Sequence, residues 1–166
     1  MAVTLRPAQP EDEEFLYALY ALSRREEMAA WGWPEAQQQM FLRMQFNARQ
    51  AHYRAQFANA EHRIIMLDGS PIGRMVVARE ADHFRLADIA LVPEHRGRGV
   101  GARLVNELLD EAGREGKTVL LFVEKQNPAV RLYGRLGFHI VGDIDSHFSM
   151  EWTSSNEPQG RKGSEC

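Results

Sequence analysis

Apolar residues recur at two different spacings along this chain, and these spacings separate its helices from its strands. A stripe at three- and four-residue steps, typical of a helix with one buried face, follows Gly101. A second stripe follows the acidic residues 11–14 and stops at the segment 31–34, Trp-Gly-Trp-Pro. The core positions of these two predicted helices are Leu104, Val105, Leu108, Leu109 and Ala112, and Phe15, Leu16, Leu19 and Leu22.

A further long helix is predicted over residues 35–57, and it is apolar on two sides. A helix of this kind is buried twice inside one domain, lines a groove, or meets a partner such as a second copy of the chain. Its main apolar face is predicted to be Met40, Phe41, Met44, Ala48 and Ala51, and the other side carries Leu42, Phe46, Tyr53 and Phe57.

Strands are predicted where apolar and polar residues alternate, or where a short apolar run stands between turn residues. Asp68-Gly69-Ser70 is a hairpin signal, and Gly142-Asp143 is expected to link the last two strands. The run 118–123, Thr-Val-Leu-Leu-Phe-Val, predicts a strand buried on both faces. The predicted strands are residues 3–8, 62–67, 71–79, 83–92, 118–123, 139–141 and 147–152.

A glycine-rich, doubly basic loop at residues 96–101, Arg-Gly-Arg-Gly-Val-Gly, stands between a predicted strand and a predicted helix. Glycine lets the backbone come close to a ligand. The first turn of a helix presents unpaired N–H groups at the positive end of its dipole. Together these features predict an anion site, most naturally for a phosphate or pyrophosphate. The alternative is a basic surface turn without a ligand.

Two familiar phosphate loops do not fit this segment. The string Gly-x-x-x-x-Gly-Lys-Ser/Thr of the P-loop is absent from the sequence. The dinucleotide fingerprint needs Gly-x-Gly-x-x-Gly after an N-terminal strand, whereas the glycines here are closer together and late in the chain. The pattern that fits is Arg/Gln-x-x-Gly-x-Gly/Ala, with Arg96, Gly99 and Gly101.

A short helix is predicted to begin at Asn127 and to end at Gly137. Asn127 is a good N-cap, and Pro128 is favoured at the first helical position. Gly137 supplies the left-handed residue that ends many helices. One face of this helix carries Ala129, Leu132, Tyr133 and Leu136.

The two segments LVPEHRGRGVG and VEKQNPAVRLYGRLGF resemble two motifs of the GNAT superfamily of acyl-CoA-dependent N-acetyltransferases, in the same order and about 25 residues apart. One departure is that Asn127 stands two residues before Ala129, where many members have three. The resemblance covers residues 3–152 and is diagnostic in residues 86–138. It implies a mixed α/β fold in which helices flank a twisted, mostly antiparallel sheet whose fourth and fifth strands are parallel and splayed.

The resemblance also implies acetyl-CoA as the acyl donor, and no metal. The backbone of the loop would hold the pyrophosphate, the edge of the fourth strand would bind the pantetheine amides, and the helix after residue 127 would line the same tunnel. The residues assigned in this way are Ile89, Ala90, Leu91, Arg96, Gly97, Arg98, Gly99, Val100, Gly101, Ala102, Asn127 and Tyr133.

The implied reaction is direct attack of an amine on the thioester carbonyl. A backbone N–H near Leu91 would polarise that carbonyl. Tyr133 matches the tyrosine that commonly gives a proton to the leaving thiolate in the family. An unperturbed tyrosine has a pKa of about 10, which suits a proton donor at neutral pH. The alternative for Tyr133 is an aromatic residue packed in the core.

The base that deprotonates the amine is an open question. Asp88, three residues before Leu91, is the first candidate, and Glu124 at the end of the fifth strand is the second. His83 has a suitable ordinary pKa. Several family members carry a catalytic glutamate where this chain has Arg85, so water stays an alternative.

The acceptor is expected to bind in the region before the fourth strand, where aromatic residues can clamp an amine. Core packing is the alternative for the same residues. The leading expectation is an enzyme for a primary amine of a small molecule or amino acid, and an amine of a peptide or protein is the rival. A non-catalytic acyl-CoA sensor and a homodimer-forming module are further alternatives. The candidate acceptor residues are Trp31, Trp33, Gln45, Phe46 and Tyr53.

Composition narrows the class of protein. The 166 residues suffice for one domain, expected over residues 1–152, with residues 153–166 as a disordered tail. The net charge of −3 gives no support for a nucleic-acid platform. No apolar stretch reaches the roughly 18 residues of a membrane span. The lone cysteine, Cys166, excludes an internal disulfide, and no signal pattern is present, so a cytoplasmic location is expected.

Overall fold

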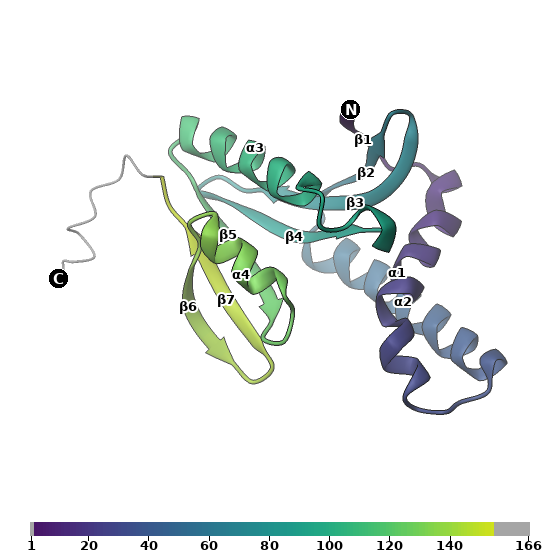
Figure 1. The fold of residues 1–166 in the computed structure, drawn as a ribbon. Coiled ribbons are helices and arrows are strands. Elements are labelled where there is room, and N and C mark those ends of the chain that lie inside the picture. The colour runs from purple at the N-terminus through teal and green to yellow at the C-terminus, as the bar shows by residue number, and fades with distance from the viewer. Residues whose placement is uncertain (1, 155–166) are drawn as a thin grey trace. The chain divides into compact units, whose positions relative to one another are not determined.

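The computed structural model describes residues 2–154 (Figure 1). The predicted order of strands and helices is confirmed, with two single 3-10 turns, η1 and η2, added. The elements are β1 (Val3–Pro7), η1 (Pro10–Asp12), α1 (Glu13–Ala29), α2 (Glu35–Gln56), β2 (Glu61–Leu67), β3 (Ser70–Arg79), β4 (His83–Leu91), η2 (Pro93–His95), α3 (Val100–Arg114), β5 (Thr118–Glu124), α4 (Ala129–Arg135), β6 (His139–Ile144) and β7 (His147–Trp152). The expected tail lies outside the described residues from position 155 onward.

The strands form a seven-stranded sheet in the order β1-β2-β3-β4-β5-β7-β6. The pairs β1–β2, β5–β7 and β6–β7 are antiparallel. β4 and β5 are parallel, as expected, and their pairing joins residues 83–85 to residues 118–120 at the start of both strands. The mixed α/β fold that was predicted from the sequence, with its parallel fourth and fifth strands, is therefore confirmed.

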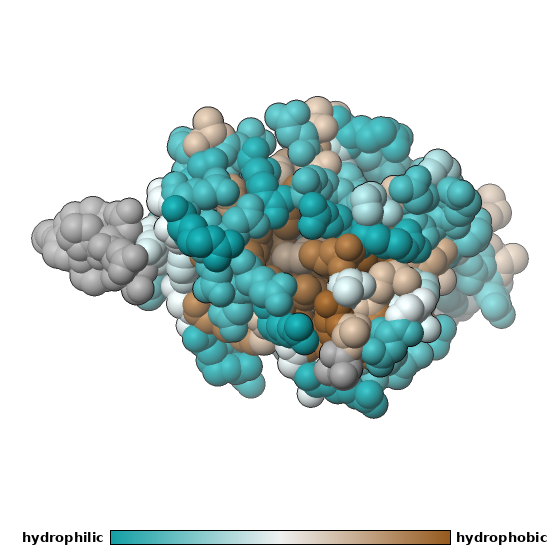
Figure 2. Space-filling model, turned by 90° about the horizontal axis from the view of Figure 1, so that it is seen from above, coloured by the Kyte–Doolittle hydropathy of each residue, from teal (hydrophilic) through white to brown (hydrophobic). Residues whose placement is uncertain are grey.

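The chain divides into two compact units. Of the described residues, the first unit holds 2–76 and 88–98, and the second holds 77–87 and 99–154. β3 and β4 contribute residues to both units. Hydrophilic residues cover much of the face drawn in Figure 2, as the 26% content of charged residues leads us to expect.

In the first unit, α2 buries the side that was predicted to be secondary. Leu42, Phe46 and Tyr53 are buried, whereas Met40 is 76% and Met44 60% exposed. The predicted main face of this helix is therefore wrong. Phe46 packs among the core residues of α1 and β2, with the Tyr17 ring edge-on at 5.6 Å. Large aromatic side chains bury more apolar area than methionine and alanine, which explains why this side faces the core.

In the second unit, α3 buries the predicted stripe, and β5 packs one face only. All five predicted core positions of α3 are buried. Val119, Leu121 and Val123 of β5 are buried, but Phe122 is 58% exposed, so burial of this strand on both faces was wrongly predicted. The Arg85 guanidinium lies 5.3 Å from the centre of the Phe122 ring and covers part of it.

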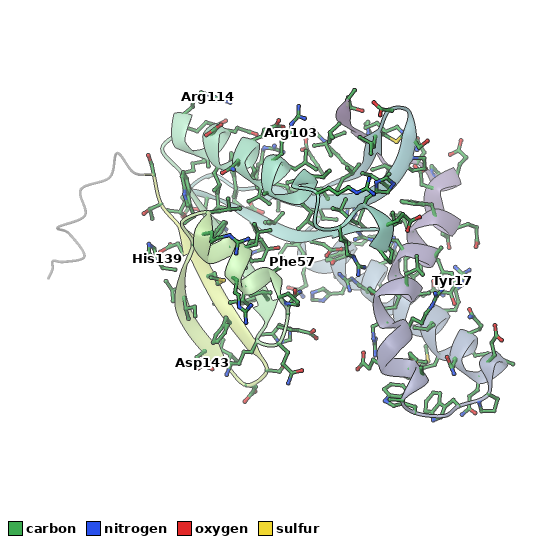
Figure 3. The ribbon with its side chains drawn as sticks, viewed as in Figure 1. Tyr17, Phe57, Arg103, Arg114, His139 and Asp143 are labelled. Atoms are coloured by element: carbon green, nitrogen blue, oxygen red, sulfur yellow. The ribbon has the colours of Figure 1, made fainter. Side chains whose placement is uncertain are left out.

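The turns follow glycine and aspartate, with one correction. Asp68 and Gly69 both have positive φ, which confirms the hairpin between β2 and β3. β6 continues past Gly142, which stands at a register shift against β7, and the turn falls at Asp145 with φ 51°. The predicted turn at Gly142-Asp143 is wrong because the glycine serves a strand irregularity. Figure 3 shows His139 and Asp143 on β6.

Candidate functional site

The segment from β4 to α3 is held by contacts of its own residues. η2 follows β4, and the backbone N–H of Val92 donates to the carbonyl oxygen of Ile72 on β3 at 2.8 Å. The Nε of Arg96 donates to the carbonyl oxygen of Leu91 at 3.0 Å. The side chain of Arg96 therefore folds back onto the end of β4, and Arg98 is exposed.

The glycines of this loop serve backbone conformation and leave open space. Gly97 has φ 74° and Gly99 φ 84°, in the left-handed region that glycine adopts without strain. Gly99 is also the N-cap of α3 and makes no side-chain cap, so the first N–H groups of the helix receive no bond from it. A Cβ atom at Gly97, Gly99 or Gly101 would meet no heavy atom within 4 Å. These features fit a bound phosphate group.

The end of β4 lies unusually close to a glycine of β3. A Cβ atom at Gly73 would stand 2.2 Å from the carbonyl oxygen of Ala90 and 2.9 Å from Cδ2 of Leu91. Gly73 is therefore required where β3 approaches the strand segment 89–91. The sequence analysis missed this residue, although a glycine inside a predicted strand is a signal of close backbone approach.

The helix α4 presents Tyr133 after a cap from Asn127. The Oδ1 of Asn127 accepts a bond from the N–H of Ala129 at 2.8 Å, so the capping role is confirmed, but the helix begins two residues later than predicted. The helix stops before Gly137, whose φ of 107° is positive as expected. Tyr133 is 8% exposed and packs edge-on against Phe138 at 5.6 Å.

Glu124 and His83 lie at opposite ends of the β4–β5 pair. Glu124 is exposed at the end of β5, opposite His147 of β7. His83 pairs with Thr118 at the start of β5, six residues from Glu124, which is about 20 Å along a strand. The Nδ1 of His83 lies 2.7 Å from Oδ1 of Asp82, and this hydrogen bond lowers the pKa of Asp82.

Asp88, the first candidate base, lies between two arginines that the sequence analysis did not assign. Its Oδ2 lies 3.1 Å from Nη2 of Arg49 on α2 and 3.2 Å from Nε of Arg74 on β3. The side chains of Asp88 and Arg74 are 18% and 7% exposed. The carboxylate of Asp88 is thus shared by two guanidinium groups.

Tyr53 and His62 complete this group of side chains. The Nε of Arg49 donates to the Tyr53 hydroxyl at 3.1 Å, and the Arg74 guanidinium lies 5.1 Å from the Tyr53 ring. Burial and the charge of Asp88 raise the pKa of Tyr53. The His62 ring lies edge-on to Tyr53 at 5.7 Å. We call Arg49, Gln50, Tyr53, His62, Arg74 and Asp88 the arginine cluster, and all six belong to the first unit.

None of the other predicted acceptor residues belongs to the arginine cluster, although Gln45 bonds Tyr20, whose ring lies 5.5 Å from the Arg49 guanidinium. Trp31 and Trp33 pack edge-on against Phe41 near the turn between α1 and α2, and the three ring centres lie 5.0–5.7 Å apart. Gln45 accepts a bond from the Tyr20 hydroxyl at 3.2 Å. Phe46 is 1% exposed and belongs to the core, so its assignment to an acceptor site is wrong.

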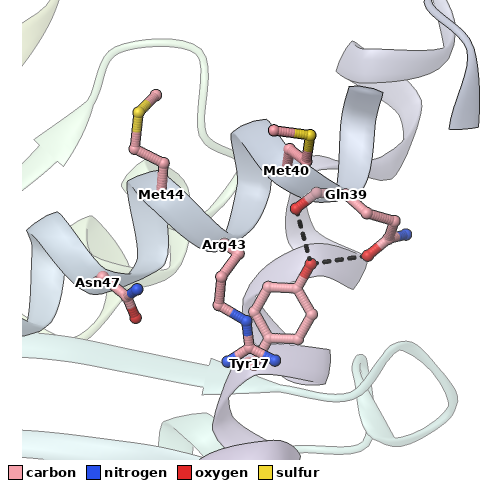
Figure 4. Close-up of a pocket in the computed structure, with 6 residues that line it drawn as sticks. All are labelled: Tyr17, Gln39, Met40, Arg43, Met44 and Asn47. Carbon is pink, nitrogen blue, oxygen red and sulfur yellow. Dashed lines mark hydrogen bonds between the residues drawn. The ribbon is translucent and has the colours of Figure 1, made fainter. Parts of the chain in front are cut away.

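An open groove on α1 and α2 contains none of the predicted site residues. The Tyr17 hydroxyl at its edge donates to Oε1 of Gln39 at 2.7 Å, and the Arg43 guanidinium lies 3.8 Å from the Tyr17 ring (Figure 4). The lining residues are Tyr17, Gln39, Met40, Arg43, Met44 and Asn47. Among residues 2–154, no group of acidic, histidine or cysteine side chains is arranged to hold a metal ion, and no helix is long and apolar enough to cross a membrane.

Comparison with known proteins identifies the class to which this fold and loop belong. Residues 16–138 match the model of the acetyltransferase (GNAT) family, and the chain therefore belongs to this family. The L-methionine sulfoximine/L-methionine sulfone acetyltransferase of Salmonella typhimurium is 38% identical over 71 residues, which cover 40% of this chain and 42% of the relative. A GCN5-like protein acetyltransferase of Mycobacterium tuberculosis is 36% identical over 92 residues, covering 48% of this chain and 44% of the relative. The matched regions thus span less than half of these relatives.

A solved structure supports the same fold over nearly the whole chain. The PaiA N-acetyltransferase of Thermoplasma acidophilum, crystallised in complex with coenzyme A, superimposes with a TM-score of 0.70. The alignment covers 92% of this chain and 99% of that protein, at 22% identity. At this identity the likeness shows the fold alone.

Proposed function

We propose that this protein is an acetyl-CoA-dependent N-acetyltransferase that moves an acetyl group to a primary amine of a small molecule or amino acid by direct attack on the thioester. The observation that carries the proposal is the loop before α3. Its two glycines with positive φ lead into a helix start without a side-chain cap, in a chain that belongs to the GNAT family. This combination suits a pyrophosphate.

Coenzyme A would be bound chiefly by backbone groups. The N–H groups at residues 97–102 would hold the pyrophosphate, and those of Ile89, Ala90 and Leu91 would bind the pantetheine arm. Arg96 would act through the backbone, since its side chain holds the carbonyl of Leu91. Asn127 would shape the start of α4 through its bond to the N–H of Ala129. The uncapped N–H groups of α3 and the open space beside the glycines support these assignments.

The chemistry needs a polarised carbonyl, an acid and a base. A backbone N–H near Leu91 would stabilise the oxyanion that forms when the amine attacks. The carbon–sulfur bond then breaks, and Tyr133 would give its hydroxyl proton to the thiolate. Burial of Tyr133 at 8% exposure supports the role of a hydroxyl shielded from bulk water.

Asp88 remains our first choice as the group that takes the proton from the amine. Glu124, His83 and a water molecule are the alternatives. Loss of a general base typically lowers a rate by about 10²–10⁴-fold. We therefore expect Asp88→Asn to lower kcat strongly, whereas Glu124→Gln leaves kcat near its original value. The reverse ranking would transfer the role to Glu124.

A second candidate function is acetylation of a protein amine. The relative from Mycobacterium tuberculosis is named a protein acetyltransferase, and that from Salmonella typhimurium is named for small amino-acid analogues. Both names are compatible with the same loop and the same donor. They differ in the size of the acceptor, which an assay with free amines and peptides would separate.

The first test is calorimetric titration of acetyl-CoA into the unaltered protein and a Gly99→Glu variant. The added side chain and negative charge at the helix start should abolish binding. The matched control is Gly116→Glu at the far end of α3, because Gly116 also has positive φ (70°) and open space beside it. The control therefore carries the same backbone strain and the same charge.

Micromolar binding by the protein and by Gly116→Glu, lost only in Gly99→Glu, is the result that the proposal predicts. Thiol release with a panel of amines would then establish transfer. A folded, unaltered protein that does not bind acetyl-CoA would overturn the proposed function.

A further inference from the structure

The arginine cluster contains a buried guanidinium group whose hydrogen-bonding capacity is largely unused. The Nη1 of Arg74 donates to Oε1 of Gln50 at 3.3 Å. Its Nη2 is buried and has no hydrogen-bond partner within residues 2–154, and its buried Nε lies 3.2 Å from Oδ2 of Asp88 without the geometry of a hydrogen bond. A guanidinium carries five N–H donors, and a buried donor without a partner is costly. Such a group in a native fold indicates a missing ligand or water.

The charges of the arginine cluster are also unbalanced. Arg49 and Arg74 share one carboxylate, that of Asp88, and neither pairs with another acidic group among the described residues. Burial lowers the pKa of His62, and the positive charge of Arg74 lowers it further, so this ring adds no charge at neutral pH. Two positive charges therefore face one negative charge. Because the nearly buried Arg74 must share its one carboxylate with Arg49, this arrangement suits one additional anion.

The ring of Tyr53 keeps both guanidinium groups in place. Their central carbons lie 5.5 Å and 5.1 Å from its centre, for Arg49 and Arg74 respectively. The Tyr53 hydroxyl accepts the bond from Arg49, so its own proton is left to donate. The side chain of Arg49 is 38% exposed, which gives solvent a route to the cluster. A planar carboxylate matches two guanidinium groups and a hydroxyl donor.

One residue of the arginine cluster, Asp88, directly precedes in sequence the strand segment 89–91, which we assign to the binding of acetyl-CoA. Asp88 is adjacent to Ile89 and stands three residues before Leu91, about 10 Å along β4. Arg49 and Arg74 both reach the carboxylate of Asp88. An anion held by them would thus lie within the length of a small substrate from the proposed reaction centre.

We propose that the arginine cluster binds the carboxylate of the acceptor, so that the acceptors of this protein are amines that carry a carboxylate, namely amino acids and their close analogues. This inference rests on the proposed function, because it names the acceptor class of that reaction. Arg49, Arg74 and Tyr53 are binding residues here, and Asp88, besides its proposed role as the base, positions the two guanidinium groups.

The first test uses the unaltered protein and matched pairs of amines. The common L-amino acids, L-methionine sulfone and 4-aminobutyrate are assayed for thiol release from acetyl-CoA, and each active amine is compared with its carboxamide. We expect the carboxamide to lose about 10- to 100-fold in kcat/KM, mainly through KM, as a charged hydrogen-bond pair is lost. The amine of an amino acid amide is less basic and more often unprotonated, so protonation cannot cause this loss.

The second test changes the arginines. Arg49→Met should bring the carboxylate-to-carboxamide ratio close to one, and Arg74→Lys should retain part of it. The matched control is Arg43→Met, an arginine of α2 that pairs with Glu13 and Glu14 and lies outside the arginine cluster. Arg43→Met should keep the full ratio. Arg49 is partly exposed, so the Arg49→Met protein is expected to fold. The first test does not depend on the folding of any variant, because it compares matched amines with the unaltered protein.

A third measurement reports the site itself. In the protein saturated with coenzyme A, the nitrogen-15 resonance of the Arg74 Nε–H group should shift when the carboxylate amine is added and should not shift with its carboxamide. If sodium chloride or sodium phosphate shifts the Arg74 signal as much as the carboxylate amine does, the site binds an adventitious ion only, and the proposal is overturned.

The outcomes separate this inference from the proposed function. Equal turnover of carboxylates and carboxamides would overturn the carboxylate site and leave the acetyltransferase intact. Binding of acetyl-CoA without binding or turnover of any carboxylate amine in the panel would also overturn the carboxylate site. Absence of acetyl-CoA binding would instead overturn the proposed function.

Discussion

The glycine-rich loop at residues 96–102 and the arginine cluster are both suited to an anion, yet they are built in opposite ways. The loop is contiguous in sequence, largely exposed, and offers backbone N–H groups set by the positive φ of Gly97 and Gly99. The cluster draws side chains from α2, β2, β3 and β4 and includes the nearly buried Arg74. Backbone dipoles are neutral and tolerate an empty site, whereas a buried guanidinium requires a partner. We therefore expect different consequences when each region is altered.

The largest effect is expected at Tyr133, which belongs to neither region and is proposed to protonate the leaving thiolate. Tyr133→Phe removes the proposed proton donor and keeps the ring that packs on Phe138. We expect kcat to fall by about 10²–10⁴-fold while the affinity for acetyl-CoA changes little. Rapid-mixing kinetics and calorimetry measure the two quantities. A Tyr133→Phe variant with unchanged kcat would assign the tyrosine to the core alone.

The next largest effect is expected at Gly73 of β3. This residue lies against β4, the strand that connects Asp88 of the arginine cluster to the loop in sequence. Alanine at this position would place Cβ 2.2 Å from the carbonyl oxygen of Ala90. We expect Gly73→Ala to lower the free energy of unfolding by about 1–3 kcal/mol, as overpacking does, and to weaken acetyl-CoA binding. Denaturant titration measures the first and calorimetry the second.

The control for Gly73 is Gly134→Ala in α4, where the added Cβ has open space. Because alanine is favoured over glycine inside a helix, this change should stabilise the protein by about 0.5–1 kcal/mol. Similar stabilities for the two variants would show that β3 can move away from β4 without cost.

The two regions differ in how far the sequence predicts them. The loop was predictable because its chemistry depends on local spacing: glycines between a strand and a helix. The order of elements and the helix cap at Asn127 follow from the same local rules. The arginine cluster was not predictable, since Arg49 and Arg74 lie 25 residues apart and meet only once α2 packs on the sheet. The wrong face of α2 has the same origin, because two apolar stripes compete and tertiary packing decides between them.

A smaller effect tests whether the loop depends on backbone conformation. Alanine at Gly97 or Gly99 must adopt a left-handed φ, which costs about 1–2 kcal/mol. We expect either change to weaken acetyl-CoA binding by roughly 10-fold. Gly101→Ala is the control, since Gly101 lies in α3 without a positive φ and has open space around it. Equal losses in all three variants would point to steric blocking by the added methyl group.

The smallest effect concerns pH. The pKa of His62 in the folded protein is below its ordinary value of 6.5, because of burial and Arg74, so the folded state binds fewer protons than the unfolded chain. The stability from His62 is therefore present above pH 6.5 and is lost as the pH falls below it. We expect the fall in unfolding free energy to be shallower in His62→Gln, measured by denaturant titration at several pH values. The same slope in His62→Gln and in the unaltered protein would contradict this assignment.

The most direct test of the account is to follow a labelled acetyl group. Acetyl-CoA with a deuterated acetyl group is incubated with the protein and a carboxylate amine, and mass spectrometry is applied to the amine, the coenzyme and the protein. The account predicts label on the amine, one free thiol for each acetylated product, and no acetylated protein during turnover. Tight binding of acetyl-CoA with the label left on the coenzyme would contradict it, and the same result with other primary amines would identify the protein as an acyl-CoA-binding sensor.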